Sequence, residues 1–286
     1  MAEKTAARPG DPLETVKSFA ATRIGKRVLS GVVMIAVALG AAAAGGAVFA
    51  GLVAALSVVL VFEWTRMVEG REFSRGFVVL AVASAAATAL AARGAYLPAY
   101  AVAALGGLLT LALDAPRSGL KALWPAAAAP YLIAPSVALI WLRAGPETGR
   151  ELIFFLFAIV WATDTGAYVA GKTIRGPRFS PVISPGKTWA GLVGGALAGA
   201  VAAAAAGRLV FEADAPGFFL LFGVSIALAT ELGDMVESAL KRRFGVKDVS
   251  GFIPGHGGAL DRLDGMIFAT FATAIVVAAV SALQGA

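Results

Sequence analysis

The stretch GMIFATFATAIVVAAVSAL, residues 265–283, contains no charged side chain. A helix needs about 20 mainly apolar residues to cross the hydrocarbon core of a bilayer, so this stretch predicts a membrane-spanning helix. The same character runs through the chain of 286 residues, which is 59% hydrophobic and 15% charged, with a mean hydropathy of +0.81. A β-barrel would show short segments of alternating polarity instead. The chain is therefore predicted to be an all-α polytopic membrane protein.

Similar apolar blocks precede this one, and together they predict about nine transmembrane helices. Several blocks are rich in Ala and Gly, and small residues of this kind let helices pack closely in lipid. The predicted spans are 28–46, 47–65, 76–93, 95–113, 122–142, 151–170, 188–207, 216–239 and 265–283.

The spans divide the chain into three predicted parts. Residues 1–27 form a cytoplasmic N-terminal tail, for which a solvated segment and an interfacial helix are open alternatives. Residues 28–143 are N-terminal transmembrane helices, expected to anchor the protein and to offer a dimer contact. Residues 151–286 form a catalytic transmembrane region with a signature loop at 238–264. We expect no cleaved signal peptide, because the first basic stretch is followed by an apolar run long enough to span.

The distribution of Lys and Arg predicts the orientation in the membrane. With the N-terminus inside, 20 of the 24 basic residues fall on the cytoplasmic side. Positive residues concentrate in cytoplasmic loops. We therefore expect an integral protein of the cytoplasmic (inner) membrane, with the N-terminus and the active site cytoplasmic and the C-terminus outside. The net charge of +6 fits this topology and anionic lipid, and we expect no nucleic-acid partner.

Acidic residues cluster just before the last span. Glu231, Asp234 and Glu237 are three apart on one predicted helix, and Asp261 and Asp264 are three apart on the next. Residues three apart share a helix face. Carboxylates brought together need a proton or a cation between them, and Mg²⁺ binds through one or two carboxylates plus substrate phosphates. The chain has no cysteine and a single histidine, which excludes disulfides and the usual zinc ligand sets.

Basic residues and glycines surround these acids. Carboxylates for a metal together with cations for phosphates are typical of phosphoryl and nucleotidyl transfer. His256 lies between glycines, in a turn whose N–H groups can face an anion. Asp164 lies inside an apolar span, where an acid needs a partner. The candidate residues outside the acidic group are Lys172, Lys187, Lys241, Arg242, Lys247, Asp248, His256, Gly257, Gly258 and Arg262.

One further motif is disfavoured. GAYVAGKT, residues 166–173, satisfies the spacing of a phosphate-binding P-loop. A P-loop needs a strand before it and a helix after it. Here a membrane span precedes the motif, and Gly176 and Pro177 discourage a following helix. Lys172 and Lys187 remain candidates for binding phosphate without that fold.

The loop at 238–264 resembles the signature of the phosphatidate cytidylyltransferase (CDP-diacylglycerol synthase) family. That signature reads Ser-x-apolar-Lys-Arg, four residues, Lys-Asp-x-small, then Pro-x-His-Gly-Gly and Asp-Arg-apolar-Asp. One departure is Ala259, where the family usually has a larger apolar residue. The matching residues are Ser238, Leu240, Lys241, Arg242, Lys247, Asp248, Ser250, Ile253, Pro254, His256, Gly257, Gly258, Asp261, Arg262, Leu263 and Asp264.

The resemblance implies a reaction in which CTP and phosphatidic acid give CDP-diacylglycerol and pyrophosphate. It implies Mg²⁺ as cofactor, paired with a second cation such as K⁺, and a polar cavity at the cytoplasmic face of the bilayer. A homodimer is compatible with it. By the resemblance, Asp234 and Asp261 hold the metal and Asp264 is the next candidate ligand, and we expect Lys241 and Arg262 to be catalytic as well. Substrate binding then falls to Asp164, Lys172, Lys187, Arg242, Lys247, Asp248, His256, Gly257 and Gly258.

Two other functions remain as alternatives. Another CTP-dependent lipid transferase or kinase would act on a hydroxyl acceptor and would need a base near the metal. An ion-coupled transporter would also carry acids within its spans. Its acids would be spread along a pathway, whereas here they crowd into one region.

Overall fold

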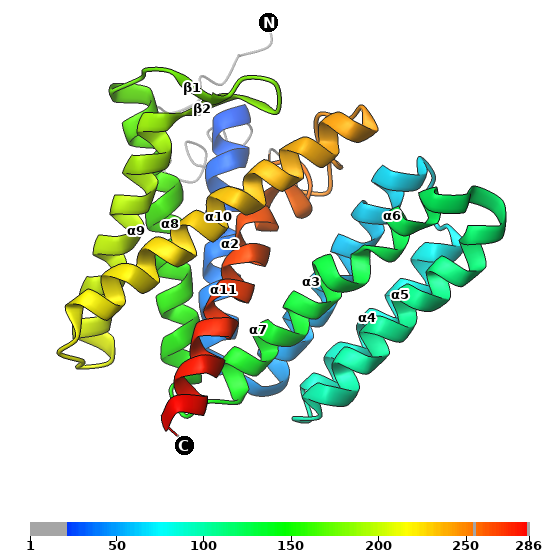
Figure 1. Cartoon of the computed structure of the whole chain (residues 1–286), viewed down its shortest axis with the longest axis horizontal. Coiled ribbons are helices and arrows are strands. Elements are labelled where there is room, and N and C mark those ends of the chain that lie inside the picture. The colour runs from blue at the N-terminus through cyan, green and yellow to red at the C-terminus, as the bar shows by residue number, and fades with distance from the viewer. Residues whose placement is uncertain (1–21, 254–255, 285–286) are drawn as a thin grey trace, which may run out of the picture.

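The computed structural model describes residues 22–253 and 256–284, and this part of the chain is almost entirely helical (Figure 1). The long helices are α2 (Arg23–Ala44), α3 (Gly46–Glu69), α4 (Arg75–Ala91), α5 (Tyr96–Ser118), α7 (Ala134–Ala144), α8 (Gly149–Thr173), α9 (Trp189–Val210), α10 (Pro216–Phe244) and α11 (Leu260–Gln284). Short elements are η1 (Gly119–Ala122), α6 (Leu123–Ala126), the π-helical η2 (Ala129–Ile133) and the antiparallel strands β1 (Arg178–Ser180) and β2 (Ser184–Thr188).

Seven helical segments among the described residues are long and apolar enough to cross a membrane, which confirms the polytopic all-α class. One of them, Tyr96–Ala144, runs through two of the predicted spans without a break. Arg75–Ala91, which corresponds to another predicted span, is apolar but shorter than the usual length. The number of nine crossings therefore stays a prediction.

Connections between helices lie at alternate ends of the molecule (Figure 1). The β1–β2 hairpin and the α10–α11 connection lie at one end, together with the start of α2. The α2–α3 turn, the α9–α10 connection and the C-terminal end of α11 lie at the other. The segments predicted to be cytoplasmic from their Lys and Arg thus share one end. Residues 1–21 of the predicted tail, including any interfacial helix, fall outside the described part.

Small residues allow α8 and α9 to pack closely, as predicted for the Ala- and Gly-rich spans. A Cβ atom added at Gly195 would lie 3.0 Å from the Thr163 carbonyl oxygen. One added at Gly191 would lie 3.1 Å from the Ala167 carbonyl oxygen. Close backbone contact of this kind is how membrane helices gain van der Waals energy without a hydrophobic driving force. It fixes the position of the polar end of α8.

Two apolar clusters hold the remaining helices. One joins α3, α4, α5 and α7 to the first turns of α11, and buries Trp64, Leu80 and Leu260 almost completely. The other packs Phe155 of α8 against Phe219 and Phe222 of α10. Ala269 of α11 also belongs to the second cluster, and Leu240 of α10 packs against the first, so both helices contact both clusters where they cross.

Candidate active site

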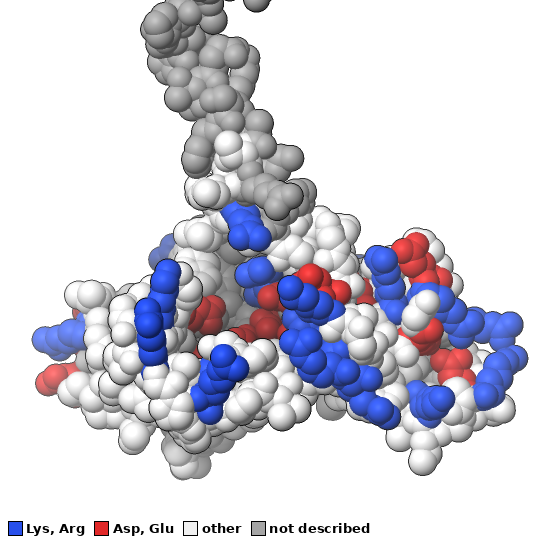
Figure 2. All heavy atoms as spheres, turned by 90° about the horizontal axis from the view of Figure 1, so that it is seen from above, with Lys and Arg blue, Asp and Glu red and all other residues white. Residues whose placement is uncertain are grey.

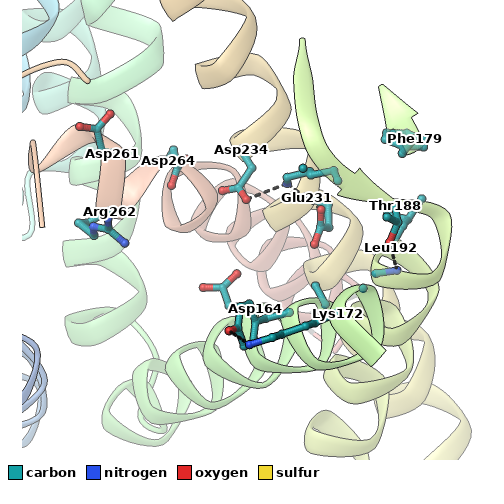
Figure 3. Close-up of a pocket in the computed structure, with 16 residues that line it drawn as sticks. Asp164, Lys172, Phe179, Thr188, Leu192, Glu231, Asp234, Asp261, Arg262 and Asp264 are labelled. Atoms are coloured by element: carbon teal, nitrogen blue, oxygen red, sulfur yellow. Dashed lines mark hydrogen bonds and ion pairs between the residues drawn. The ribbon is translucent and has the colours of Figure 1, made fainter. Parts of the chain in front are cut away.

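A cavity of about 720 Å³ lies between α8, α9, α10, α11 and the β1–β2 hairpin. Figure 3 shows its side chains converging from these elements. Seen from above, acidic side chains lie at the floor of a hollow, and Lys and Arg side chains lie around it (Figure 2). The acidic lining residues are Asp164, Glu231, Asp234, Asp261 and Asp264, and the basic ones are Lys172, Lys187 and Arg262.

Three carboxyl groups from three helices face this cavity: Asp164 from α8, Asp234 from α10 and Asp264 from α11 (Figure 3). Asp234 lies close to the backbone beside Asp264, since a Cβ atom added at Gly265 would lie 3.6 Å from Asp234 Oδ1. Gly233 makes this approach possible, since a Cβ there would come within 3.0 Å of the Asp264 carbonyl carbon. Two carboxylates this close repel each other, so a proton or a cation must lie between them.

Lys187 of β2 reaches two acids of α10. Its Nζ lies 2.7 Å from Asp234 Oδ2 and 2.8 Å from Glu231 Oε2. Burial, the largest effect, disfavours the charged amine, but the attraction of Asp234 and Glu231 outweighs it and raises the pKa of Lys187 above its ordinary value. Lys187 is therefore a fixed positive charge beside the acid pair. Glu231 was grouped with Asp234 by its spacing but was given no role of its own, and this ion pair makes it part of the site.

Asp261 lies at the edge of the cavity, and its carboxylate points away from Asp234 (Figure 3). Its Oδ1 accepts a hydrogen bond from Lys241 at 3.0 Å. Its Oδ2 accepts from the backbone N–H groups of Gly258 at 2.9 Å and Val249 at 3.3 Å. Asp261 therefore holds both ends of the loop that precedes α11.

Glu237 completes this arrangement. Lys241 Nζ lies 2.8 Å from Glu237 Oε1, one helical turn away on α10, and it contacts Asp261 as well. Only 3% of the Glu237 side chain is exposed. A buried acid without a counter-charge would cost several kcal/mol, so Lys241 has to stay in place. Lys241 is thus a bridge between α10 and α11 below the loop.

Sequence reasoning missed Glu63, which comes from α3 and is fully buried. Its Oε1 accepts from Ala259 N at 3.0 Å and from the Ser250 hydroxyl, and its Oε2 accepts from Leu260 N at 2.7 Å. The carboxylate thereby satisfies N–H groups at the start of α11, which have no partner within the helix. The sequence does contain a signal for Glu63, because it is an acid within an apolar span. An acid at such a position is costly unless it has a hydrogen-bonding or charged partner.

A second, smaller cavity of about 450 Å³ adjoins the first and shares Arg262 with it. Its other lining residues are Arg27 of α2 and Asp248, His256 and Gly257 of the loop. His256 Nδ1 lies 2.7 Å from the Ser30 hydroxyl of α2, and Arg262 Nε donates to the His256 carbonyl oxygen at 3.0 Å. Burial, then the charges of Arg262 and Arg27, lowers the pKa of His256.

The structure thus sorts the predicted residues into groups. Asp164, Lys172, Lys187, Asp234, Asp264 and Arg262 share the large cavity, and Asp261 lies at its edge. Asp248, His256 and Gly257 line the small one, whereas Lys241 and Gly258 contact Asp261. Arg242 and Lys247 are exposed and line neither cavity.

The motif with P-loop spacing is helical and does not form a phosphate-binding loop, in agreement with the sequence analysis. Residues 166–173 are the last turns of α8. Lys172 Nζ lies 3.0 Å from the Tyr168 hydroxyl and above that ring, on the wall of the large cavity. The lysine is therefore placed by a helix rather than by a glycine-rich loop.

The acids were also predicted to bind a metal. Within residues 22–253 and 256–284, no group of three or more His, Cys, Asp or Glu side chains has the arrangement of a metal site. The Asp234–Asp264 pair does fit Mg²⁺, which needs only one or two carboxylates and takes water and phosphate oxygens as its other ligands. To bind the same metal ion as Asp234 and Asp264, Asp261 would have to give up its hydrogen bonds with Lys241 and with the loop backbone. Its role as a ligand stays a prediction.

Comparison with known proteins gives a consistent result. A model of the cytidylyltransferase family matches residues 25–280. A phosphatidate cytidylyltransferase of Brucella suis is 35% identical over 250 residues, covering 85% of this chain and 89% of that protein. Proteins of the same name from Haemophilus influenzae and Staphylococcus aureus are 40% and 44% identical over 126 and 122 residues. These two alignments cover 42% of this chain and 43% and 46% of those proteins.

Proposed function

The chain belongs to the cytidylyltransferase family, and from this premise and the site we propose that it makes CDP-diacylglycerol and pyrophosphate from CTP and phosphatidic acid. The observation that carries the proposal is that Asp234 and Asp264, at the close crossing of α10 and α11, line a cavity that also holds Lys187 and Arg262. The similarity to a phosphatidate cytidylyltransferase over 85% of the chain supports the choice of substrates. The apolar helices fit a substrate that stays in the bilayer.

The chemistry needs little from a protein base. An oxygen of the phosphatidate phosphate attacks the α-phosphorus of CTP and forms a phosphoanhydride bond. The bond from the α-phosphorus to the oxygen bridging to the β-phosphate breaks, and pyrophosphate leaves with that electron pair. The attacking oxygen is already anionic, so the protein has to align two anions and offset their charge.

The acid pair is where we place the metal. Asp234 and Asp264 would hold Mg²⁺, which when bound offsets the charge of the triphosphate and of the leaving pyrophosphate. Asp164 faces the same space from α8 and would supply a further carboxylate for a second cation such as K⁺. These acids also hold Lys187 in position beside the phosphates through its contact with Asp234.

The basic residues are proposed to bind the substrate phosphates and to position the signature loop. Lys187 of the hairpin and Lys172 of α8 both line the cavity and would bind the triphosphate. Arg262 lies at the boundary of the two cavities, where the attacking and attacked phosphates have to meet. Lys241 and Asp261 keep the signature loop in place and act on the reaction through it.

The location follows from the substrates. CTP is cytoplasmic, so the end of the molecule with the hairpin and the α10–α11 loop faces the cytoplasm of a bacterial inner membrane and the C-terminus lies outside. The cluster of Lys and Arg residues on this end supports that orientation (Figure 2). A homodimer is compatible with this location, and its contact would come from the N-terminal helices.

The proposal is tested with purified protein in phosphatidate micelles, labelled CTP and Mg²⁺, by following CDP-diacylglycerol and pyrophosphate. We expect both products in equal amounts from the wild type. We expect none from Asp264→Asn, with the variant as monodisperse as the wild type. Transfer of the γ-phosphate to a lipid alcohol would show a kinase instead, and a folded wild type without either product would refute the proposal.

A further inference from the structure

The small cavity beside the candidate active site has a composition suited to a phosphate group. Its described lining contains two guanidinium groups, Arg27 and Arg262, one imidazole, His256, and one acid, Asp248. The backbone of Gly257 has a positive φ of 87° and forms part of the wall. Guanidinium groups bind phosphate oxygens through paired charge-assisted hydrogen bonds. The two guanidinium groups outnumber the single acid, so the lining favours an anion.

The position of this cavity along the membrane normal points to a lipid. Arg27 is the first residue of a candidate membrane span, Arg27–Ala44, and therefore lies at the depth of lipid headgroups. The next turns of α2 expose Val28, Leu29 and Val32, each more than half accessible. Only 11% of this span is buried inside the protein. A lipid with its phosphate beside Arg27 could lay its acyl chains along this apolar face.

The two cavities are linked by one side chain. Arg262 lines both, and its Nε is fixed by the His256 carbonyl oxygen at 3.0 Å. His256 is held in turn by the Ser30 hydroxyl of α2 at 2.7 Å. An anion in the small cavity would therefore share Arg262 with an anion in the large one. This is the arrangement that two phosphates need to approach for in-line transfer.

We infer that the small cavity is the site for the phosphate monoester of the lipid substrate, and that Arg27 of α2 determines affinity for that lipid without contacting the nucleotide. The inference rests on the proposed function for the identity of the second substrate. It gives α2 a role beyond anchoring. The large cavity, with the acid pair and Lys187, is then left to the triphosphate.

The test replaces Arg27 by Gln and uses Arg75→Gln as the matched control. Arg75 begins α4, is exposed, and lies at the same end of the molecule outside both cavities. We expect Arg27→Gln to raise the KM for phosphatidate about tenfold, the loss of one charge-assisted contact. The KM for CTP should stay unchanged, and the control should match the wild type in both. A rise in the KM for CTP alone, or no change in either, would overturn the inference.

A binding measurement separates this inference from the proposed reaction. Wild type and Arg27→Gln are reconstituted in phosphatidylcholine nanodiscs that contain added phosphatidate, added phosphatidylglycerol or neither, and lipid binding is measured without CTP. We expect the wild type to prefer phosphatidate, a monoester, over phosphatidylglycerol, a diester, and Arg27→Gln to lose that preference. Equal binding of both lipids would mean a general anionic surface and would overturn the inference. Selective binding without CTP turnover would uphold it while refuting the proposed reaction.

Inorganic phosphate serves as the soluble probe of the same cavity. If it displaces phosphatidate from the wild type at millimolar concentration, and Arg27→Gln reduces that competition, the cavity recognises the phosphate group itself, as inferred. If it displaces phosphatidate equally from both proteins, phosphate acts elsewhere and the assignment to Arg27 is wrong.

Discussion

The carboxylate of Glu63 accepts the N–H of Leu260 at 2.7 Å, which joins α3 to the first residue of α11 across 197 positions of sequence. Helix α3 of the N-terminal half therefore contributes directly to the loop that borders the site. Glu63 fixes the end of the signature loop next to Gly258, whose N–H holds Asp261. A second link of this kind joins Ser30 of α2 to His256.

Replacing Glu63 tests this connection. Glu63→Ala leaves two backbone N–H groups and the Ser250 hydroxyl without their acceptor, at about 1–3 kcal/mol for each buried group. Glu63→Gln keeps one acceptor oxygen, so we expect it to fold and to lose about tenfold in kcat. The thermal midpoint in detergent and the steady-state kinetics provide the measurements.

Glu69→Gln is the control for this pair, since Glu69 is also on α3 but forms an ion pair with Arg71 and does not contact the loop. We expect its kcat to equal that of the wild type. If Glu63→Gln lowered stability and left the kcat of the folded fraction intact, Glu63 would have a role in folding only.

Gly233→Ala tests the crossing of α10 and α11. The new methyl group would meet the Asp264 backbone, which cannot move aside as a side chain could. Overpacking of this kind costs about 1–3 kcal/mol and would separate Asp234 from Asp264. We expect a large loss of turnover and a weaker dependence on Mg²⁺ concentration, both measured by pyrophosphate release.

Gly51→Ala provides the comparison within a helix, because a Cβ at that position of α3 has no atom within 4 Å. Alanine is favoured over glycine in helix interiors by about 0.5–1 kcal/mol, so this variant should be slightly more stable and fully active. Equal activity of the two variants would mean that the close crossing does not set the geometry of the acids.

Much of this site could be predicted from local sequence. The three-residue spacing of Asp234 and Glu231 placed both on one helix face, and the pairing of Glu237 with Lys241 followed from their separation of four residues. Partners from distant segments could not be found this way. Nothing in the spacing indicates that Lys187 of a hairpin would reach Asp234, or that Glu63 would reach Leu260. Those contacts depend on how whole helices pack.

Lys187→Met should have a large effect on substrate binding and stability, because one lysine pairs with both Glu231 and Asp234. Without the ammonium group, Glu231 and Asp234 lie one helical turn apart on the same face of α10 without the counter-charge of Lys187, and each lost charged contact costs about 1.5–3 kcal/mol. We expect the KM for CTP to rise at least tenfold and the protein to need more Mg²⁺ for the same thermal midpoint. Lys121→Met, outside the cavity on η1, should change neither quantity.

The pH dependence of the Lys187 pairs has a definite sign. Because the pKa of Lys187 is raised above the ordinary 10.5, its contribution to stability is complete below that value and is lost only as pH rises through the folded-state pKa. Any decline in wild-type stability between pH 7 and 9 should therefore persist in Lys187→Met. If that decline disappeared in the variant, Lys187 would titrate in this range and the raised pKa would be wrong.

His256 is the single histidine of the chain, so one imidazole signal in an NMR titration reports on the small cavity directly. Burial and the charges of Arg262 and Arg27 lower its pKa, so we expect an apparent value below the ordinary 6.5. The stability that follows from this shift is complete above pH 6.5 and is lost as pH falls through the folded-state pKa.

Arg27→Gln removes one of the two cations near His256 and should raise the pKa of its imidazole, whereas Arg75→Gln should leave that pKa unchanged. Bound phosphatidate should also raise it, because an anion favours the imidazolium form. A signal that titrates at or above 6.5 in the lipid-free protein would contradict the placement of His256 between the two arginines.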